Sequence, residues 1–169
     1  MFKRFVIIFS ILGILYIPFR MVIKSYALEK IQGTVKQVRA SSNRIPYYTF
    51  SLEEYPCSFY NKGNGTLSLL KTPPKPGEQS ASLMIQSSDR SLLNSNESIF
   101  YFAFHPKDKL IDLYYSIVRP GIFTHFTFLF LYFLILLLNA LGAYRYPKQD
   151  IFTHLIKGYL LLIFLLMFL

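Results

Sequence analysis

Three long apolar runs constrain this chain more than any other feature of its sequence. They cover Phe5–Ile23, Ile122–Leu141 and Ile151–Leu169, and the only Lys, Arg, Asp or Glu residues within them are Arg20 and Lys157. A helix rises about 1.5 Å per residue and the hydrocarbon core of a bilayer is roughly 30 Å thick, so a run of about 20 residues can cross it. The runs therefore predict three transmembrane helices.

Composition supports the same class of protein. The chain is 53% hydrophobic and only 16% charged, whereas an ordinary soluble domain is about 25% charged. Lys3 and Arg4 precede the first run as they would in a signal peptide, and Ser25-Tyr26-Ala27 loosely fits a small-x-small cleavage site, but Arg20 and Lys24 lie between the apolar stretch and that site. Those charges are unfavourable for cleavage, so we expect an uncleaved anchor helix.

The segment between the first and second runs has a different pattern. Short β-branched and aromatic stretches alternate there with turn residues: "IQGTVKQVR", "YYTFSL", "YPCSFY", "TLSLL", "SASLMIQ" and "SIFYFAF". Such spacing predicts a small, mainly antiparallel β barrel or sandwich. "KDKLIDLYYSIV" has helical periodicity and is expected to lead into the second span. The predicted fold class is thus membrane α plus β, with a β-domain inserted between the first two of three transmembrane helices.

The predicted organisation follows from these patterns. We expect an anchor helix at 1–23, a β-rich extracytoplasmic domain at 24–120, a second transmembrane helix at 121–143, a short basic loop at 144–150 and a third transmembrane helix at 151–169. The positive charges flanking the spans are nearly balanced, and the short loop "AYRYPKQD" decides the orientation because short basic loops stay in the cytoplasm. This places the N-terminus in the cytoplasm of a multi-pass protein of the bacterial inner (cell) membrane.

Part of the β-rich segment resembles a loose group of small bacterial membrane proteins of unknown function. The likeness lies in "IQGTVKQV" directly after an anchor helix, then "PYYTFSL", then "LLKTPPKPGEQSASLMIQ". In that group a β-domain that opens with a Gly-x-Val strand is held between transmembrane helices. The resemblance implies architecture, and it implies no catalytic residue. The serine-rich stretch near 87–98 and the third span depart from the pattern.

Residues that could perform catalysis or bind metal are scarce. Cys57 is the sole cysteine, so neither an intrachain disulfide nor a cysteine metal pair is possible. His105, His125 and His154 fall in separate parts of the predicted topology, and the sequence contains no nucleophile elbow, zinc-protease motif, phosphate loop or dinucleotide fingerprint. We therefore predict no catalytic residue, no metal site and no cofactor.

Two groups of residues are candidates for contacts. Exposed tyrosines and strand edges supply rigid apolar area and hydrogen bonds, which makes Tyr47, Tyr48, Tyr55 and Tyr60 the candidate partner-binding residues, with core packing as the alternative for each. In an antiparallel hairpin of the second and third spans, Asn139 would lie at the depth of His154 and Lys157. An intramembrane polar contact among these three is the second hypothesis, and snorkelling of Lys157 to the interface is its alternative.

These observations favour an accessory or interaction protein over an enzyme. The helices would present the β-domain at the outer face of the membrane to bind another protein, as a subunit of a membrane complex or as a toxin-immunity protein. The alternative is an enzyme or transport component whose site is completed by another chain. Residues 24–120 contain 12 Lys/Arg and 8 Asp/Glu, an excess that suits anionic lipid and is too small for a nucleic-acid surface. The expected partners are thus the lipid bilayer and a protein, with no nucleic acid and no small-molecule ligand indicated.

Overall fold

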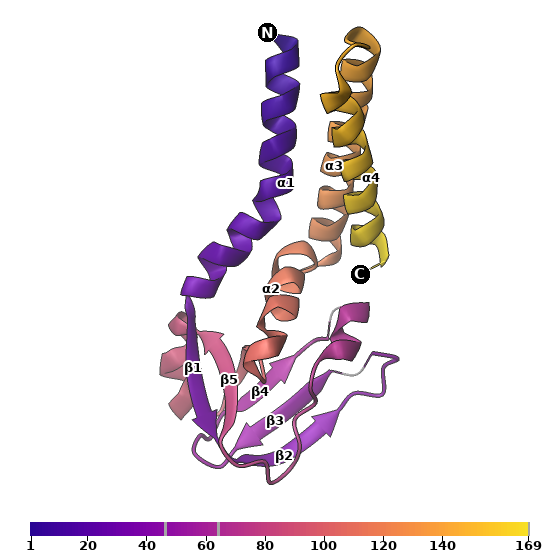
Figure 1. Cartoon of the computed structure of the whole chain (residues 1–169). Helices are drawn as coiled ribbons and strands as arrows, with labels where there is room; N and C mark the ends of the chain where they lie inside the picture. Colours follow the sequence, from indigo (N-terminus) through magenta and orange to yellow (C-terminus); the bar gives the residue numbers. More distant parts are fainter. Residues whose placement is uncertain (46, 64, 169) are drawn as a thin grey trace. The chain divides into compact units, whose positions relative to one another are not determined.

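The computed structural model describes residues 1–45, 47–63 and 65–168. The chain divides into two compact units (Figure 1). One unit contains Met1–Arg20 and Ile117–Leu169, and the other contains Met21–Ser116. The first unit is helical and the second holds all of the strands in the described residues.

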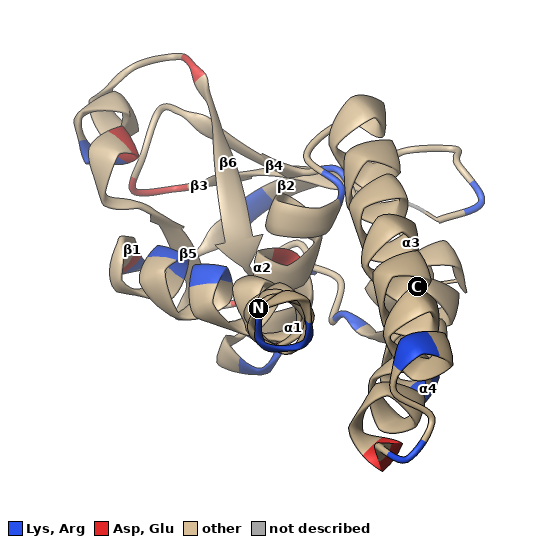
Figure 2. Cartoon of the chain, turned by 90° about the horizontal axis from the view of Figure 1, so that it is seen from above, with Lys and Arg blue, Asp and Glu red and all other residues tan. Residues whose placement is uncertain are grey.

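Three long apolar helices supply the helical unit, and the first of them continues past Arg20 into the other unit. They are α1 (Phe2–Tyr26), α3 (Ile122–Arg145) and α4 (Asp150–Phe168), and each is long and apolar enough to cross a membrane. Arg145 in the last turn of α3 and Asp150 in the first turn of α4 carry charge where the two helices join, and most of the length of both helices is uncharged (Figure 2). The three predicted spans are confirmed as helices, and the chain is a multi-pass membrane protein.

Helices α3 and α4 form a closely packed hairpin. The last turn of α3 is closed by the Tyr146 N–H, which donates to the Gly142 carbonyl oxygen at 2.9 Å. A Cβ on Gly142 would lie 2.5 Å from the nearest ring carbon of Phe152, which is fully buried. Glycine at 142 therefore lets the ring of Phe152 pack directly on the α3 backbone, as small residues do in membrane helix pairs.

The second unit contains a six-stranded sheet. Its strands are β1 (Leu28–Gly33), β2 (Val35–Ala40), β3 (Tyr48–Leu52), β4 (Ser58–Asn61), β5 (Ala81–Gln86) and β6 (Ser98–Ala103). Their spatial order is β1-β5-β6-β4-β3-β2. The β4–β6 pair is parallel and the other four pairs are antiparallel, which confirms a mainly antiparallel sheet.

The strand order curls the sheet into a barrel-like form. Strands β1 and β2 stand at opposite ends of the spatial order, yet only Thr34 separates them along the chain. Residues 28–40 therefore act as one bent strand. Its first half pairs with β5 and its second half pairs with β3. Counted this way, the sheet has the five-stranded, partly open Greek-key arrangement of an OB-type barrel. Such a fold name carries no function by itself.

The bend at Thr34 explains the glycine before it. Both carboxylate oxygens of Glu54 accept the Thr34 N–H at 2.9 Å, and this hydrogen bond lowers the pKa of Glu54. A Cβ on Gly33 would collide with the Glu54 carboxylate and lie 2.9 Å from Leu52 Cδ1. A larger residue at 33 would therefore require the ends of the Glu54 and Leu52 side chains to move.

The sheet encloses the core of the β-rich unit. Its aromatic centre is Phe50, whose ring contacts those of Phe59, Tyr101 and Phe104 at centroid distances of 5.1 to 5.5 Å. Cys57 is fully buried in the same core, and burial raises the pKa of its thiol. Cys57 is thus a packing residue.

One predicted strand is wrong. "TLSLL" forms the 3-10 helix η1 (Thr66–Leu70), because the strand before it, β4, already has β3 on one edge and β6 on the other. No edge of β4 is left for a following strand. Further 3-10 helices lie at η2 (Ser87–Asn94) and η3 (Pro106–Asp108), and the predicted amphipathic helix is α2 (Lys109–Val118).

Candidate functional site

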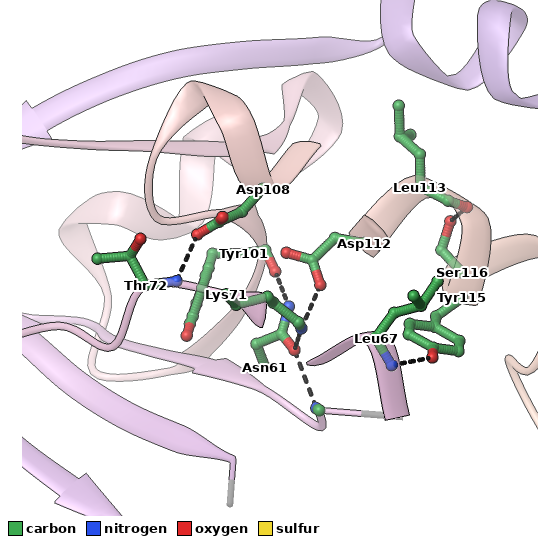
Figure 3. A network of polar contacts seen from close by, with 11 residues as sticks. Asn61, Leu67, Lys71, Thr72, Tyr101, Asp108, Asp112, Leu113, Tyr115 and Ser116 are labelled. Carbon is green, nitrogen blue, oxygen red and sulfur yellow. Dashed lines mark hydrogen bonds and ion pairs between the residues drawn. The ribbon is translucent and has the colours of Figure 1, made fainter. Parts of the chain in front are cut away.

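A buried polar cluster joins three parts of the β-rich unit (Figure 3). Asn61 ends β4, Lys71 follows η1, and Asp108 and Asp112 come from η3 and the first turn of α2. The side chains of Asn61, Asp108 and Asp112 are at most 3% exposed. Buried charges of this kind require partners, so the cluster is a defined site in an otherwise apolar interior.

Lys71 lies at the centre of the cluster. Its Nζ donates to Asp112 Oδ1 at 2.5 Å and to Asn61 Oδ1 at 2.9 Å. The amide nitrogen of Asn61 donates in turn to the carbonyl oxygen of Tyr101 at 2.8 Å. Strand β6, strand β4 and helix α2 are thereby linked through one lysine and one asparagine.

The local sequence explains how the two acids come together. Asp108 and Asp112 are four residues apart at the junction of η3 and α2, so they share one helix face. Asp108 Oδ2 accepts the backbone N–H of Thr72 at 3.0 Å, which fixes the segment that carries Lys71. This spacing was visible in "KDKLIDLYY", whereas nothing in the sequence pointed to Asn61 or Lys71.

The electrostatics of Asp112 set the chemistry of the site. Burial raises the pKa of Asp112 to about 6, Lys71 partly offsets this effect, and Asp108 adds to it. Within the described residues, Asp112 Oδ2 has no hydrogen-bond partner. The carboxyl group of Asp112 can therefore exchange a proton close to neutral pH.

The adjoining cavity is very small. It has a volume of about 20 Å³ and is also lined by Tyr47, Tyr48 and Tyr101. This volume holds about one water molecule. The cluster can thus bind water and exchange a proton, but it has no room for a substrate.

The structure separates the four candidate tyrosines. Tyr47 and Tyr48 lie at the cavity, whereas Tyr60 on β4 places its ring 5.5 Å from that of Phe100. Tyr55 is half-buried, contacts the Phe59 ring at 6.5 Å, and lines two surface clefts of about 340 and 470 Å³. Among the four, Tyr55 is the one flanked by open surface on two sides.

The intramembrane polar contact has a different partner from the predicted one. Asn139 Nδ2 donates to Ser10 Oγ at 2.7 Å and to the Ile135 carbonyl oxygen at 2.8 Å. His154 Nδ1 is instead 2.7 Å from the Asp150 carbonyl oxygen, and Lys157 is exposed. Asn139 therefore connects α3 to α1.

The reason for this difference is the direction of the side chains around α4. Phe152, Tyr159 and Leu166 are the buried residues of α4, and their seven-residue spacing marks its packed face. Lys157 is two residues from Tyr159, a rotation of about 200° around the helix axis, so it lies on the side of α4 away from the packed face. The sequence does not state which face of the helix packs.

The described residues contain no group of three or more His, Cys, Asp or Glu that could hold a metal ion. Comparisons with protein-family models, with curated proteins and with solved structures returned no match. Function is therefore inferred from the geometry of the chain itself.

Proposed function

We propose that this protein is an integral membrane accessory or interaction protein. Its three helices hold the β-rich unit at the membrane, and that unit binds a protein partner at the outer face. The partner is a larger membrane complex or a toxin that the protein neutralises. In this proposal the protein lies in a bacterial inner membrane with its N-terminus in the cytoplasm.

The observation that supports this proposal is the surface around Tyr55. One flanking cleft is lined by Glu29, Lys30 and Arg90, and the other by Lys36, Glu53 and Glu54. A half-buried tyrosine with open clefts of mixed charge on both sides suits a broad protein surface, because aromatic anchors dominate such interfaces and charges at their rim give specificity. The enclosed cavity, by contrast, holds about one water.

The test is photo-crosslinking in native membranes with the full chain. A crosslinking amino acid at Tyr55 is expected to capture one protein in stoichiometric yield, and the same group at Tyr60 is the matched control because its ring packs against Phe100. In a separate co-purification without crosslinker, Tyr55→Ala should weaken capture of the same protein by at least about tenfold, which corresponds to about 1.4 kcal/mol at an interface. Equal capture from both positions, or none from either, would contradict the proposal.

Folding of each variant needs an independent check. Cys57 is fully buried, so a thiol reagent should modify it only after the β-rich unit opens. A Tyr55→Ala chain that protects Cys57 as well as the unsubstituted chain does is folded. Loss of capture in that chain then reports the surface and not the core.

A second candidate function is an enzyme or transport component whose site is completed by another chain. Asp112 favours it, because its Oδ2 lacks a hydrogen-bond partner in the described structure and its pKa is raised to about 6. A partner that opened the cavity would meet a carboxyl group ready to move a proton. Asp112→Asn should then abolish the activity of the complex while partner capture persists. If the protein only binds its partner, Asp112→Asn should leave the activity of the complex unchanged.

A further inference from the structure

The 3-10 helix η1 leaves two adjacent leucines in the open. Leu69 is 63% exposed and Leu70 is 70% exposed, and η1 contains no buried residue. Large apolar side chains exposed side by side on a short turn contribute little to the fold of their own unit. Such a pair indicates contact with something apolar outside that unit.

Helix η1 is fixed to a helix that continues toward a membrane span. The backbone N–H of Leu67 donates to the hydroxyl of Tyr115 at 3.0 Å, and Lys71, which follows η1, is paired with Asp112. Both partners belong to α2. Helix η1 is therefore attached to α2 on both sides of its two exposed leucines.

The chain limits how far this attachment lies from the bilayer. Tyr115 precedes Ile122, the first residue of span α3, by only seven positions. At no more than about 3.6 Å per residue, the chain between them spans at most about 25 Å. Helix η1 is thus tied within reach of the membrane surface whichever way the spans are oriented.

The charge around η1 suits a lipid surface. Residues 62–75 contain three lysines and no Asp or Glu. Lys62 and Lys75 on either side of η1 are exposed. Leucines flanked by lysines are typical of interfacial membrane contacts, in which apolar side chains enter the acyl boundary and cations meet anionic headgroups.

We propose that Leu69 and Leu70 of η1 insert into the interface of the bilayer that the helices cross, as an additional membrane contact of the β-rich unit. The occupant of this apolar surface is lipid. The proposal is independent of the partner-binding function, because Tyr55 and its clefts involve no residue of η1.

The absence of tryptophan from the sequence gives a clean test. Leu69→Trp in the full chain, reconstituted in vesicles that contain anionic phospholipid, carries the sole tryptophan. Lipids brominated near the top of the acyl chain should quench it at least about threefold more than they quench the control, and its emission should be blue-shifted. The control is Glu53→Trp. Glu53 is exposed and lies at the end of the β3–β4 hairpin opposite to Asn61, the residue after which the chain leads into η1.

Each outcome decides the proposal. Emission typical of water with quenching no greater than that of Glu53→Trp would overturn it. A blue-shifted Leu69→Trp that resists both iodide and brominated lipid would also overturn it, because protein would then cover the leucines. Protection of Cys57 from a thiol reagent establishes that each variant is folded. In the Leu70→Asp background, the lipid quenching of Leu69→Trp should fall by about half or more.

Discussion

Asp112 makes the stability of the β-rich unit depend on pH. Its pKa is raised from 3.8 to about 6, chiefly by burial, so the folded state binds a proton over a pH range in which the unfolded chain does not. Stability falls with rising pH wherever the folded state binds more protons. The contribution of this carboxyl group to the free energy of unfolding is therefore fully present below about pH 4. It is lost as the pH rises through about 6.

We predict that Asp112→Asn flattens this dependence. A shift of about two pKa units corresponds to an upper limit of roughly 3 kcal/mol between pH 4 and pH 7. Denaturant unfolding of the full chain in detergent, followed by Cys57 reactivity, measures it at each pH. The control is Glu97→Gln, because Glu97 is exposed. An unchanged pH profile in Asp112→Asn would show that Asp112 does not titrate in this range.

Gly142 is a residue at which helix packing is sensitive to a single methyl group. The atoms that an added Cβ would meet belong to the ring of Phe152, at 2.5 and 2.6 Å, and a buried ring moves little. We predict that Gly142→Ala destabilises the hairpin by about 1–3 kcal/mol. Gly158→Ala is the matched control, since a Cβ there meets nothing within 4 Å. Thermal unfolding in detergent that ranks the two variants equally would contradict this packing.

At the scale of elements, polar groups attach α1 to the α3–α4 hairpin. Besides the Asn139–Ser10 hydrogen bond, the hydroxyl of Tyr159 donates to the Ser10 carbonyl oxygen at 2.6 Å and that of Tyr132 donates to the Gly13 carbonyl oxygen at 3.1 Å. Lipid supplies no hydrophobic force between helices, so such contacts fix their register. Three helices thus meet at one turn of α1.

We predict that Ser10 and Asn139 are energetically coupled. Ser10→Ala and Asn139→Leu, made singly and together, should depart from additivity by about 0.6 kcal/mol, the average for such contacts in membranes. Unfolding in detergent provides the measurement. The comparison pair is Asn139→Leu with Lys157→Leu, whose effects should add because Lys157 is exposed. Coupling in the lysine pair and none in the serine pair would reverse the assignment.

At the scale of the whole molecule, the charges beside the spans predict the orientation of the chain in the membrane. The short basic loop at 144–150 predicts that residues 24–120 lie outside the cytoplasm. Both probes are single cysteines in a Cys57→Ala background, and the reagent is an impermeant thiol reagent. Ser42→Cys is expected to react in intact cells. Gln149→Cys is expected to react only after the membrane is permeabilised. Gly63 is unsuitable as a probe site because it is buried and has a φ of 61°, which a cysteine tolerates poorly. The reverse labelling pattern would invert the topology.

Much of the secondary structure was determined by the sequence itself. The three spans, most of the strands and α2 followed from hydropathy and periodicity, because these properties belong to contiguous residues and need no knowledge of what lies opposite. The exception is η1, for which the local pattern predicted a strand. Its conformation depends on strands β3 and β6 having taken both edges of β4.

Only the tertiary structure decided where side chains meet. Asn61 reaches Tyr101 across 40 positions, Lys71 reaches Asp112 across 41, and Asn139 reaches Ser10 across 129. The sequence states the polarity of each residue, but not which face of its strand or helix packs or against which partner. The polar cluster of the β-rich unit and the attachment of α1 therefore became visible only in three dimensions, because each depends on the direction of side chains that the chain brings together from distant segments.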